Sequence, residues 1–405
     1  MKSKIVAAAL IVLTAGGVAF YPAHKSGGAV VDPAVDPKNQ VPAMAAATLK
    51  RPRVEVVFAL DTTGSMGGLI HAAKEKIWSI ATTLAQADPA PEIRMGLVAY
   101  RDRGDRYVTR VVDLSADLDS VYATLMDFRA EGGGDGPESV NQALYEAVNG
   151  ISWSKDDNAY RVIFLVGDAP PHMDYQGEVQ YPQTLAVAKA RGIVVNTIQA
   201  GNSRQTRRIW QQIAQAGLGQ YAQVSQSGNA VAIRTPYDEK LAALSEKLDA
   251  TRLYYGDKKE QEKKRAKLAA AARVHESASV ESRARRATFN ASGSGKANLF
   301  GDGELVEDIA SGRVELDEIA REHLPASLRA MAPDEQRAVI HEMAEEREAL
   351  QKEIAKLTAQ RRDFLEKRVV ESGGAKGSLD HKLYGAIREQ AARVGMSYET
   401  EAPAY

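Results

Sequence analysis

The stretch Val54–Met66, VEVVFALDTTGSM, decides the fold of this 405-residue chain. Its first half is apolar at successive positions, which is typical of a central strand in a parallel sheet that helices cover on both faces. The strand is expected to end at Asp61. Gly64 and Gly67 then let the backbone turn into an amphipathic helix, which we predict over about residues 68–87.

This strand-to-helix corner carries oxygen ligands. Asp61, Thr63 and Ser65 supply one carboxylate and two hydroxyls at two-residue spacing. Neutral hydroxyls can bind Mg²⁺ or Mn²⁺ directly, while the carboxylate holds the water molecules of the ion in place. The sequence therefore predicts a divalent-cation site here. The alternative is that Ser65 or Thr63 only caps the following helix.

The amino-acid composition excludes several classes of protein. A hydrophobic content of 44% allows at least one sizeable core, and the formal net charge of -1 indicates nothing about partners. The chain has no cysteine, which excludes a disulfide scaffold and any cysteine-ligated zinc or iron-sulfur site.

The N-terminal residues resemble an export signal. Two lysines precede an apolar run from Ile5 to Phe20, and a small residue stands at Ala19. We expect a signal peptide over residues 1–19, with an uncleaved membrane anchor as the alternative. A proline-rich flexible linker is expected over residues 20–52. The predicted location is therefore the periplasm or the cell surface.

Strand-like and helix-like segments alternate from residue 53 onward, which predicts an α/β fold with a parallel sheet and helices on both faces. Besides the first strand, strands are expected at 92–100, 107–114, 161–166, 192–199 and 219–224, and helices at 117–128, 139–148, 181–190 and 204–216.

Four motifs follow one another in this part of the chain. They are DTTGSM (Asp61–Met66), YRDRGD (Tyr100–Asp105), GGGDGPE (Gly132–Glu138) and LVGDAPPH (Leu165–His172). In this order and spacing, residues 53–228 resemble the von Willebrand factor type A (VWA) family. The resemblance implies a doubly wound, Rossmann-like fold with a metal-ion-dependent adhesion site (MIDAS), in which magnesium completes its coordination with a carboxylate from a partner.

The resemblance also extends the set of expected metal ligands. Asp168, which ends the apolar strand IFLVGD, is expected as the second acidic member, with a turn-capping role as the alternative. Adhesive members of the family have a threonine in the third loop, where this chain has GGGDGPE. We therefore expect Asp135 near the metal, with Ser139 as the alternative. An added carboxylate favours the cation but disfavours an acidic ligand from a partner.

Three residues are candidates for the rim of the site: His172, Ser139 and Arg101. For His172, a solvent-facing position is favoured over a contact with the ligand. Arg101 belongs to a charged loop that either surrounds the site or forms solvated salt bridges. Glu138 is interpreted only as an acidic residue that interacts favourably with the dipole of the next helix.

The rest of the chain is predicted to be helical. We expect a basic helical extension over 229–290, a Gly/Ser linker over 291–303 and a C-terminal helical region over 304–405. Within the last, residues 333–370 show heptad spacing that Arg347 and Arg361 interrupt, which indicates a helical hairpin or a weak coiled coil.

These patterns favour an exported, non-enzymatic binding protein that recognises a protein partner in the envelope through a divalent cation. The basic run 258–267 is interpreted as a solvated helix, so no nucleic-acid partner is expected. Two other functions stay open. One is a regulatory VWA module of a phosphoryl-transfer system, and the other is an architectural protein that forms homo-oligomers through its C-terminal helix.

Overall fold

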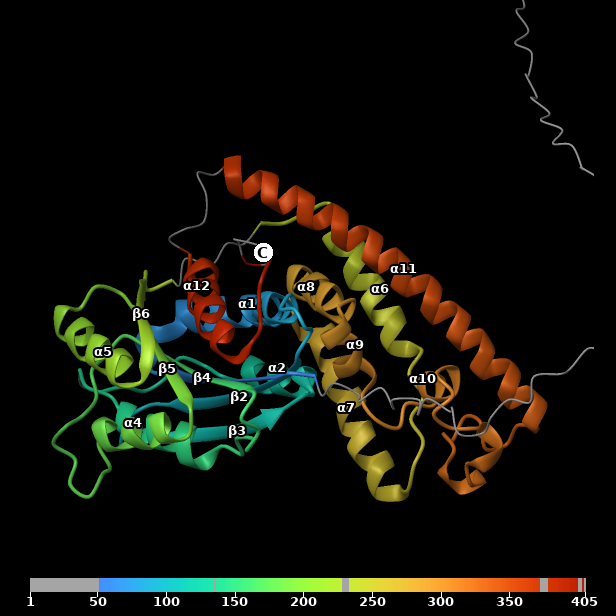
Figure 1. Ribbon diagram of the computed structural model, residues 1–405, viewed down its shortest axis with the longest axis horizontal. Helices are drawn as coiled ribbons and strands as arrows, with labels where there is room; N and C mark the ends of the chain where they lie inside the picture. Colours follow the sequence, from blue (N-terminus) through green and yellow to red (C-terminus); the bar gives the residue numbers. More distant parts are fainter. Residues whose placement is uncertain (1–50, 135, 228–232, 372–377, 400–402, 404–405) are drawn as a thin grey trace, which may run out of the picture. The chain divides into compact units, whose positions relative to one another are not determined.

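Six strands form one sheet in the order β3-β2-β1-β4-β5-β6 (Figure 1). Neighbouring strands pair in parallel, except that β3 runs antiparallel to β2 at one edge. The order reverses between β1 and β4, and open α/β sheets bind ligands at the carboxyl ends of the strands at such a point. The strands are β1 (Arg53–Asp61), β2 (Glu92–Tyr100), β3 (Thr109–Ser115), β4 (Ala159–Gly167), β5 (Ile193–Ala200) and β6 (Leu218–Val224).

Helices cover both faces of this sheet. Val54, Val56 and Leu60 of β1 belong to the apolar core on one face, whereas Val57 and Ala59 belong to the core on the other. The first face packs against α1 (Gly67–Ala85), α2 (Leu118–Met126) and α12 (Leu379–Ala391), and the second against α3 (Val140–Tyr145), its π-helical continuation η2 (Glu146–Gly150), α4 (Tyr181–Ala190) and α5 (Arg204–Ala216). The predicted doubly wound α/β fold is confirmed.

The computed structural model describes residues 51–405 apart from 135, 228–232, 372–377, 400–402 and 404–405. The expected signal peptide, most of the expected linker and the candidate ligand Asp135 lie outside the described residues. Within them, no helix combines the length and apolar character that crossing a membrane requires.

The last helix of the chain completes the core of the sheet. Leu383 of α12 lines a small apolar cavity of about 30 Å³ with residues of β1, β4 and α1. Gln390 accepts hydrogen bonds from the Tyr160 hydroxyl (2.7 Å) and the Asn196 amide (3.0 Å) on β4 and β5. A helix from the far C-terminus therefore covers the face that β1 and its neighbours need to bury.

The remaining helices form the predicted helical region. They are α6 (Asp238–Ala250), α7 (Lys258–Ser277), α8 (Val280–Asn290), α9 (Gly293–Phe300), α10 (Leu305–Ala310) and α11 (Pro333–Glu371), with short 3-10 turns at η1 (Gly64–Met66), η3 (Leu316–Glu318), η4 (Arg321–His323) and η5 (Ala392–Val394). Where the sequence predicts a Gly/Ser linker over 291–303, the structure has α9. Ser292 caps this helix by accepting a hydrogen bond from the Gly295 N–H (2.9 Å). A Cβ at Gly295 would collide with the Phe289 carbonyl, so the glycine serves close packing.

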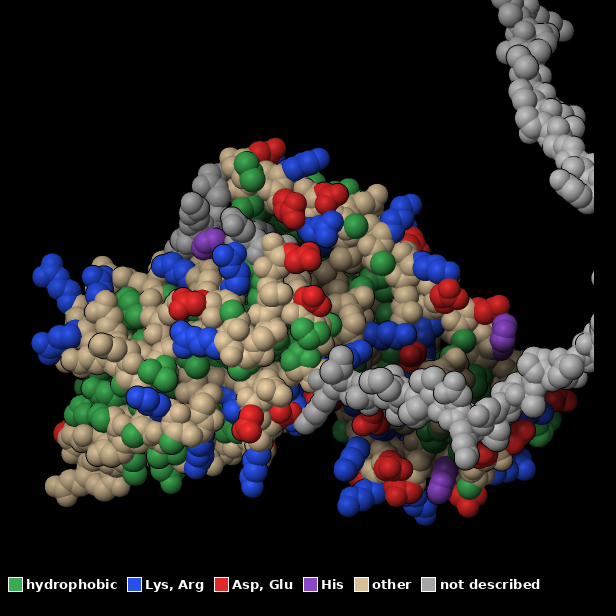
Figure 2. Space-filling view, in the orientation of Figure 1, with side chains coloured by type: hydrophobic (Ala, Val, Ile, Leu, Met, Phe, Trp, Pro, Cys, Tyr) green, Lys and Arg blue, Asp and Glu red, His purple; other side chains and the backbone are tan. Residues whose placement is uncertain are grey.

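Helix α11 buries its heptad seam within the same chain. Leu350, Ile354 and Leu357 pack in one cluster with leucines of α6. The two arginines that interrupt the seam are buried in ion pairs: Arg347 lies 2.7 Å from Glu304, and Arg361 lies 2.8 Å from Asp238. The outward face of α11 intersperses acidic and basic side chains (Figure 2). An oligomer through the seam would have to displace these intramolecular contacts, so oligomerisation there stays a prediction.

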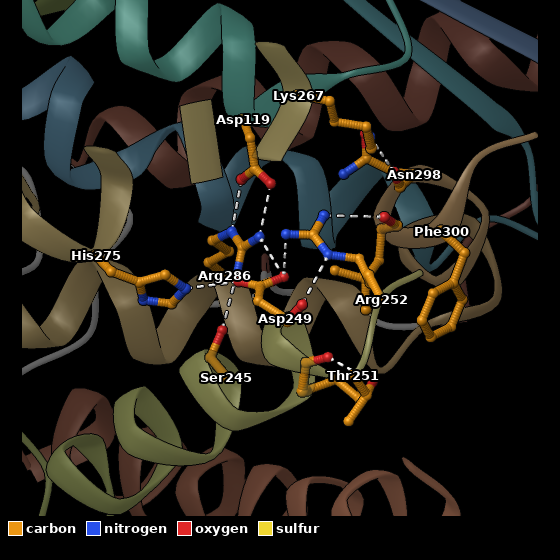
Figure 3. Close-up of polar contacts among 12 residues, drawn as sticks. Asp119, Ser245, Asp249, Thr251, Arg252, Lys267, His275, Arg286, Asn298 and Phe300 are labelled. Carbon is orange, nitrogen blue, oxygen red and sulfur yellow. Dashed lines mark hydrogen bonds and ion pairs between the residues drawn. The ribbon is translucent and has the colours of Figure 1, made fainter. Parts of the chain in front are cut away.

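Arg286 joins the helical region to the sheet (Figure 3). Its fully buried guanidinium donates to Asp119 of α2 (2.5 and 2.6 Å) and to Asp249 of α6 (2.7 and 3.1 Å). Ser245 and His275 complete this cluster. Burial alone would raise the pKa of Asp249, but the guanidinium holds it well below its usual range. Helices α2, α6 and α8 are thus fixed around the Arg286 guanidinium.

Replacing Arg286 with methionine should lower the free energy of unfolding by about 3–5 kcal/mol, because two buried carboxylates lose their counter-charge. Urea denaturation at neutral pH measures this. The matched control is Arg368→Met, which removes an exposed pair with Glu371 and should change stability by less than about 0.5 kcal/mol. Equal effects of the two substitutions would show that Arg286 does not hold the junction.

Candidate functional site

The four sequence motifs meet at the carboxyl ends of the central strands. Main-chain hydrogen bonds tie their loops together, so the assembly does not depend on side chains alone. These bonds run from Gly64 N to Gly132 O (3.1 Å), from Glu138 N to Pro170 O (2.9 Å) and from Ser139 N to Arg101 O (3.2 Å). The structure therefore brings the loops of the four motifs together, as their order in the sequence predicts, and we call the place where Asp61, Thr63, Ser65, Glu138 and Asp168 meet the crevice.

Asp61 is the last residue of β1 and is fully buried. Its Oδ1 accepts hydrogen bonds from the backbone N–H (2.9 Å) and the hydroxyl (2.7 Å) of Thr63. Its Oδ2 has no hydrogen-bond partner among the described residues. Burial, together with the charge of Asp168, raises the pKa of Asp61 from 3.8 to about 7. One oxygen of this carboxyl is thus available to a ligand whose interaction offsets the free-energy cost of burying it.

Glu138 is a second buried acid that the sequence interpretation missed. Its side chain is 4% exposed, and within the described part of the chain Oε2 finds no hydrogen-bond partner. Burial raises the pKa of Glu138 from 4.5 to about 9, and the carboxylates of Asp61, Asp102, Asp105 and Asp168 add to the effect. The interpretation as a helix-dipole residue is wrong, because the bonds of its backbone to the GDAPPH loop hold Glu138 in the crevice.

Ser65 and Asp168 are less buried than Asp61, and the side-chain amide of Gln226 connects them. The Gln226 side chain donates to Asp168 Oδ2 (2.6 Å) and to the Ser65 carbonyl (3.1 Å). Ser65 is exposed and Asp168 is half-buried. Gln226 follows β6 outside every motif, so nothing in the sequence pointed to it.

The rim candidates form a network around Asp102. Its carboxylate accepts hydrogen bonds from the Ser139 hydroxyl (2.9 Å) and the Tyr175 hydroxyl (2.7 Å), and it lies 3.4 Å from His172 Nε2. His172 is 5% exposed and stacks on Tyr175, so the solvent-facing position favoured from the sequence is wrong. Arg101 is also buried, 4.5 Å above the ring of Tyr107. Ser139 is thus engaged by Asp102.

The glycine loop owes its shape to Asp105. Its carboxylate accepts hydrogen bonds from the Gly133 N–H (3.0 Å) and the Asp102 N–H (3.2 Å). Gly132 and Gly133 have φ angles of +75° and +80°, and a Cβ at Gly132 would overlap the Asp105 carboxylate. Only glycine suits this position, and the loop can then lie directly beside Thr63 and Glu138.

The donor set fits a divalent cation. It contains one carboxyl oxygen each of Asp61 and Glu138 that has no hydrogen-bond partner among the residues described, and the Thr63 and Ser65 hydroxyls of the DTTGSM loop. All are oxygens, which Mg²⁺ and Mn²⁺ prefer. Within the described ranges, no three His, Asp or Glu side chains are grouped as a metal-binding cluster. Of the acids expected as ligands, the structure describes Asp61 and Asp168, so hydroxyls and water molecules would have to complete the coordination of the ion.

Part of the chain is similar in sequence to known proteins. A family model described as "von Willebrand factor A domain" matches residues 55–236. Von Willebrand factor A domain-containing protein 7 from Rattus norvegicus is 38% identical over 120 residues, 30% of this chain and 12% of that protein. Alpha-protein kinase vwkA from Dictyostelium discoideum is 29% identical over 122 residues, 29% of this chain and 19% of the kinase. The chain thus matches under a fifth of the length of these relatives.

A solved structure of proximal thread matrix protein 1 from the mussel byssus, with a zinc-occupied MIDAS motif, is 12% identical. The match covers 43% of this chain and 42% of that one, with a TM-score of 0.34. The zinc is a property of that protein.

The raised pKa values predict how stability depends on pH in a chelator. Between about pH 4 and pH 7 the folded chain holds a proton on Asp61 that the unfolded chain has released, and Glu138 holds such a proton up to about pH 9. The free energy of unfolding contributed by these groups therefore falls as the pH rises. Glu138→Gln should make the fall shallower, as measured by urea denaturation in EDTA across this range.

The control for this experiment is Asp363→Asn, at an exposed position of α11. It should leave the pH dependence as it is in the wild type. If Glu138→Gln also left the slope unchanged, Glu138 would not carry the proton that its burial requires.

Proposed function

Residues 55–236 form a von Willebrand factor A domain, and from this premise we propose that the protein is a binding module whose contact with a protein partner depends on a divalent cation. VWA domains commonly mediate interactions between proteins. The cation would be Mg²⁺ or Mn²⁺, because the donors at this site are all oxygens. The proposal is one of binding and includes no catalytic step.

The observation that carries this proposal concerns two buried oxygens, Asp61 Oδ2 and Glu138 Oε2, for which the described part of the chain offers no hydrogen-bond partner. Leaving buried polar atoms without partners is unfavourable, and burying charge without a counter-charge is more so. A divalent cation in the crevice would satisfy both atoms and neutralise the cluster of carboxylates. The residues proposed to hold the ion, directly or through water molecules, are Asp61, Thr63, Ser65, Glu138 and Asp168.

Access from solvent supports a role in binding rather than in stability alone. Ser65 is exposed and Asp168 is half-buried, whereas Asp61 and Glu138 lie beneath them. A cation held by all four would therefore be reachable from the side of Ser65. The Gln226 amide, which occupies Asp168 Oδ2, would have to yield when the cation takes that oxygen.

Addition of Mg²⁺ or Mn²⁺ to the full chain should raise its melting temperature at pH 7.5. At a concentration of a hundred times Kd the gain corresponds to about 2.7 kcal/mol. Asp61→Asn keeps the shape of the side chain and should abolish the gain while raising the melting temperature in EDTA, since it removes a buried acid. Ser65→Ala should reduce the gain, and Asp363→Asn should retain it. A wild-type protein that melts identically in Mg²⁺ and EDTA would contradict the proposal.

The partner can be sought with the same variants as bait. Immobilised full-length protein should retain a set of proteins from an extract of the native host in Mg²⁺ and lose that set in EDTA. The Asp61→Asn bait should lose the same set in both conditions, because it lacks the carboxylate that holds the ion. Equal retention by the two baits would show that binding does not use the cation.

A further inference from the structure

Four arginines surround a hollow beside the candidate cation site. The hollow has a volume of about 420 Å³, and its side chains come from the YRDRGD loop, from β3 and from the segment after α2. We name this surface the arginine pocket and define it by Arg101, Arg106, Arg110, Arg129, Tyr107 and Phe128.

The pocket carries positive charge that the protein does not neutralise. Its two acids are already engaged: Asp127 pairs with Arg273 of α7, and Glu131 lies 3.5 Å from Arg101. Arg106, Arg110 and Arg129 are exposed, and their side chains have no acidic partner within the described residues. Three guanidinium groups are therefore free to pair with an incoming anion.

Aromatic rings lie beside two of the guanidinium groups, the buried one of Arg101 and the exposed one of Arg110. Arg101 lies 4.5 Å above the ring of Tyr107 and donates from Nη2 to the Arg129 carbonyl (2.9 Å). Arg110 lies 5.7 Å from the centre of the Phe128 ring. A planar guanidinium that is already oriented loses little freedom when it binds a carboxylate through two parallel hydrogen bonds.

Thr62 connects the pocket to the candidate cation site. The Thr62 hydroxyl lies 2.8 Å from the Tyr107 hydroxyl and 3.4 Å from Arg101 Nε. Asp61 precedes Thr62 in the chain and opens the acid-rich crevice on the other side. A carboxylate from a partner is attracted by the arginines of the pocket.

We propose that the arginine pocket binds a segment of a protein partner with clustered Asp or Glu side chains. This proposal rests on the proposed function and specifies the chemistry of the partner. Single-stranded nucleic acid is the other polyanion to consider. It gains affinity by stacking bases on open aromatic faces. Here Arg101 covers Tyr107, and Phe128 is buried with Arg110 near its ring. The pocket therefore fits carboxylates better than bases.

The test uses fluorescently labelled hexaglutamate, with hexaglutamine as the neutral probe, and measures anisotropy on the full chain at low ionic strength. Hexaglutamate should bind and hexaglutamine should not. The combined substitution of Arg106, Arg110 and Arg129 by glutamine should weaken hexaglutamate binding by about tenfold or more. The matched control replaces Lys258, Lys259 and Lys263 of α7, also exposed, by glutamine and should weaken it by less than about twofold.

Two results would overturn the assignment of the pocket. Equal weakening by the arginine and lysine triple variants would mean that only net charge matters. The second result comes from competition against labelled hexaglutamate. If a hexathymidine oligonucleotide or tripolyphosphate displaces the label at a much lower concentration than unlabelled hexaglutamate does, the ligand carries phosphate instead.

Repeating the titration in EDTA and with Asp61→Asn separates this inference from the proposed function. Hexaglutamate binding should persist in both, because the arginines need no cation. If it is lost in both, the carboxylates bind at the cation and the inference fails while the proposed function stands. If Mg²⁺ does not stabilise the protein but hexaglutamate still binds at the arginines, the proposed function fails and the pocket stands.

Discussion

Burial of several carboxyl groups in one crevice is the constraint on which the site depends. Asp61 and Glu138 are out of reach of water, and each keeps one oxygen without a partner among the described residues. Their pKa values of about 7 and about 9 mean that, with no cation bound at neutral pH, Glu138 keeps its proton and Asp61 is about half protonated. A divalent cation would replace those protons, because it binds the same oxygens and carries more charge.

The rest of the chain holds this crevice rigid. The strands that end at the crevice are packed on one face by α12, which arrives from the C-terminus, and the helical region is fixed to α2 through Arg286. The helical region is thus bound to the α/β domain by buried contacts that include these two. Changes in either contact are therefore expected to reach the loops that carry the oxygens.

The sequence predicted the strands and helices of residues 53–224 well, because buried parallel strands are continuously apolar and the helices between them are amphipathic. It also predicted that the motifs containing Asp61 and Asp168 would meet, since the carboxyl ends of parallel strands lie at one edge. It did not predict Glu138, Gln226 or α9. Their roles depend on contacts between loops or helix ends, and residue type and spacing do not determine these. The heptad pattern of 333–370 indicated a helix correctly, but only the structure shows that Arg347 and Arg361 pair with acids inside the chain.

Charges of opposite sign lie on the two sides of Thr62. Acids lie on the side of Asp61, arginines lie on the side of Tyr107, and the two groups are separated by one threonine. The central claim is that the protons of the crevice exchange for a cation. Calorimetric titration of the full chain with Mn²⁺ at pH 7, in buffers with different heats of ionisation, measures this directly. The account predicts one ion bound per chain with the release of about one to two protons, and binding without proton release, or no binding, would contradict it.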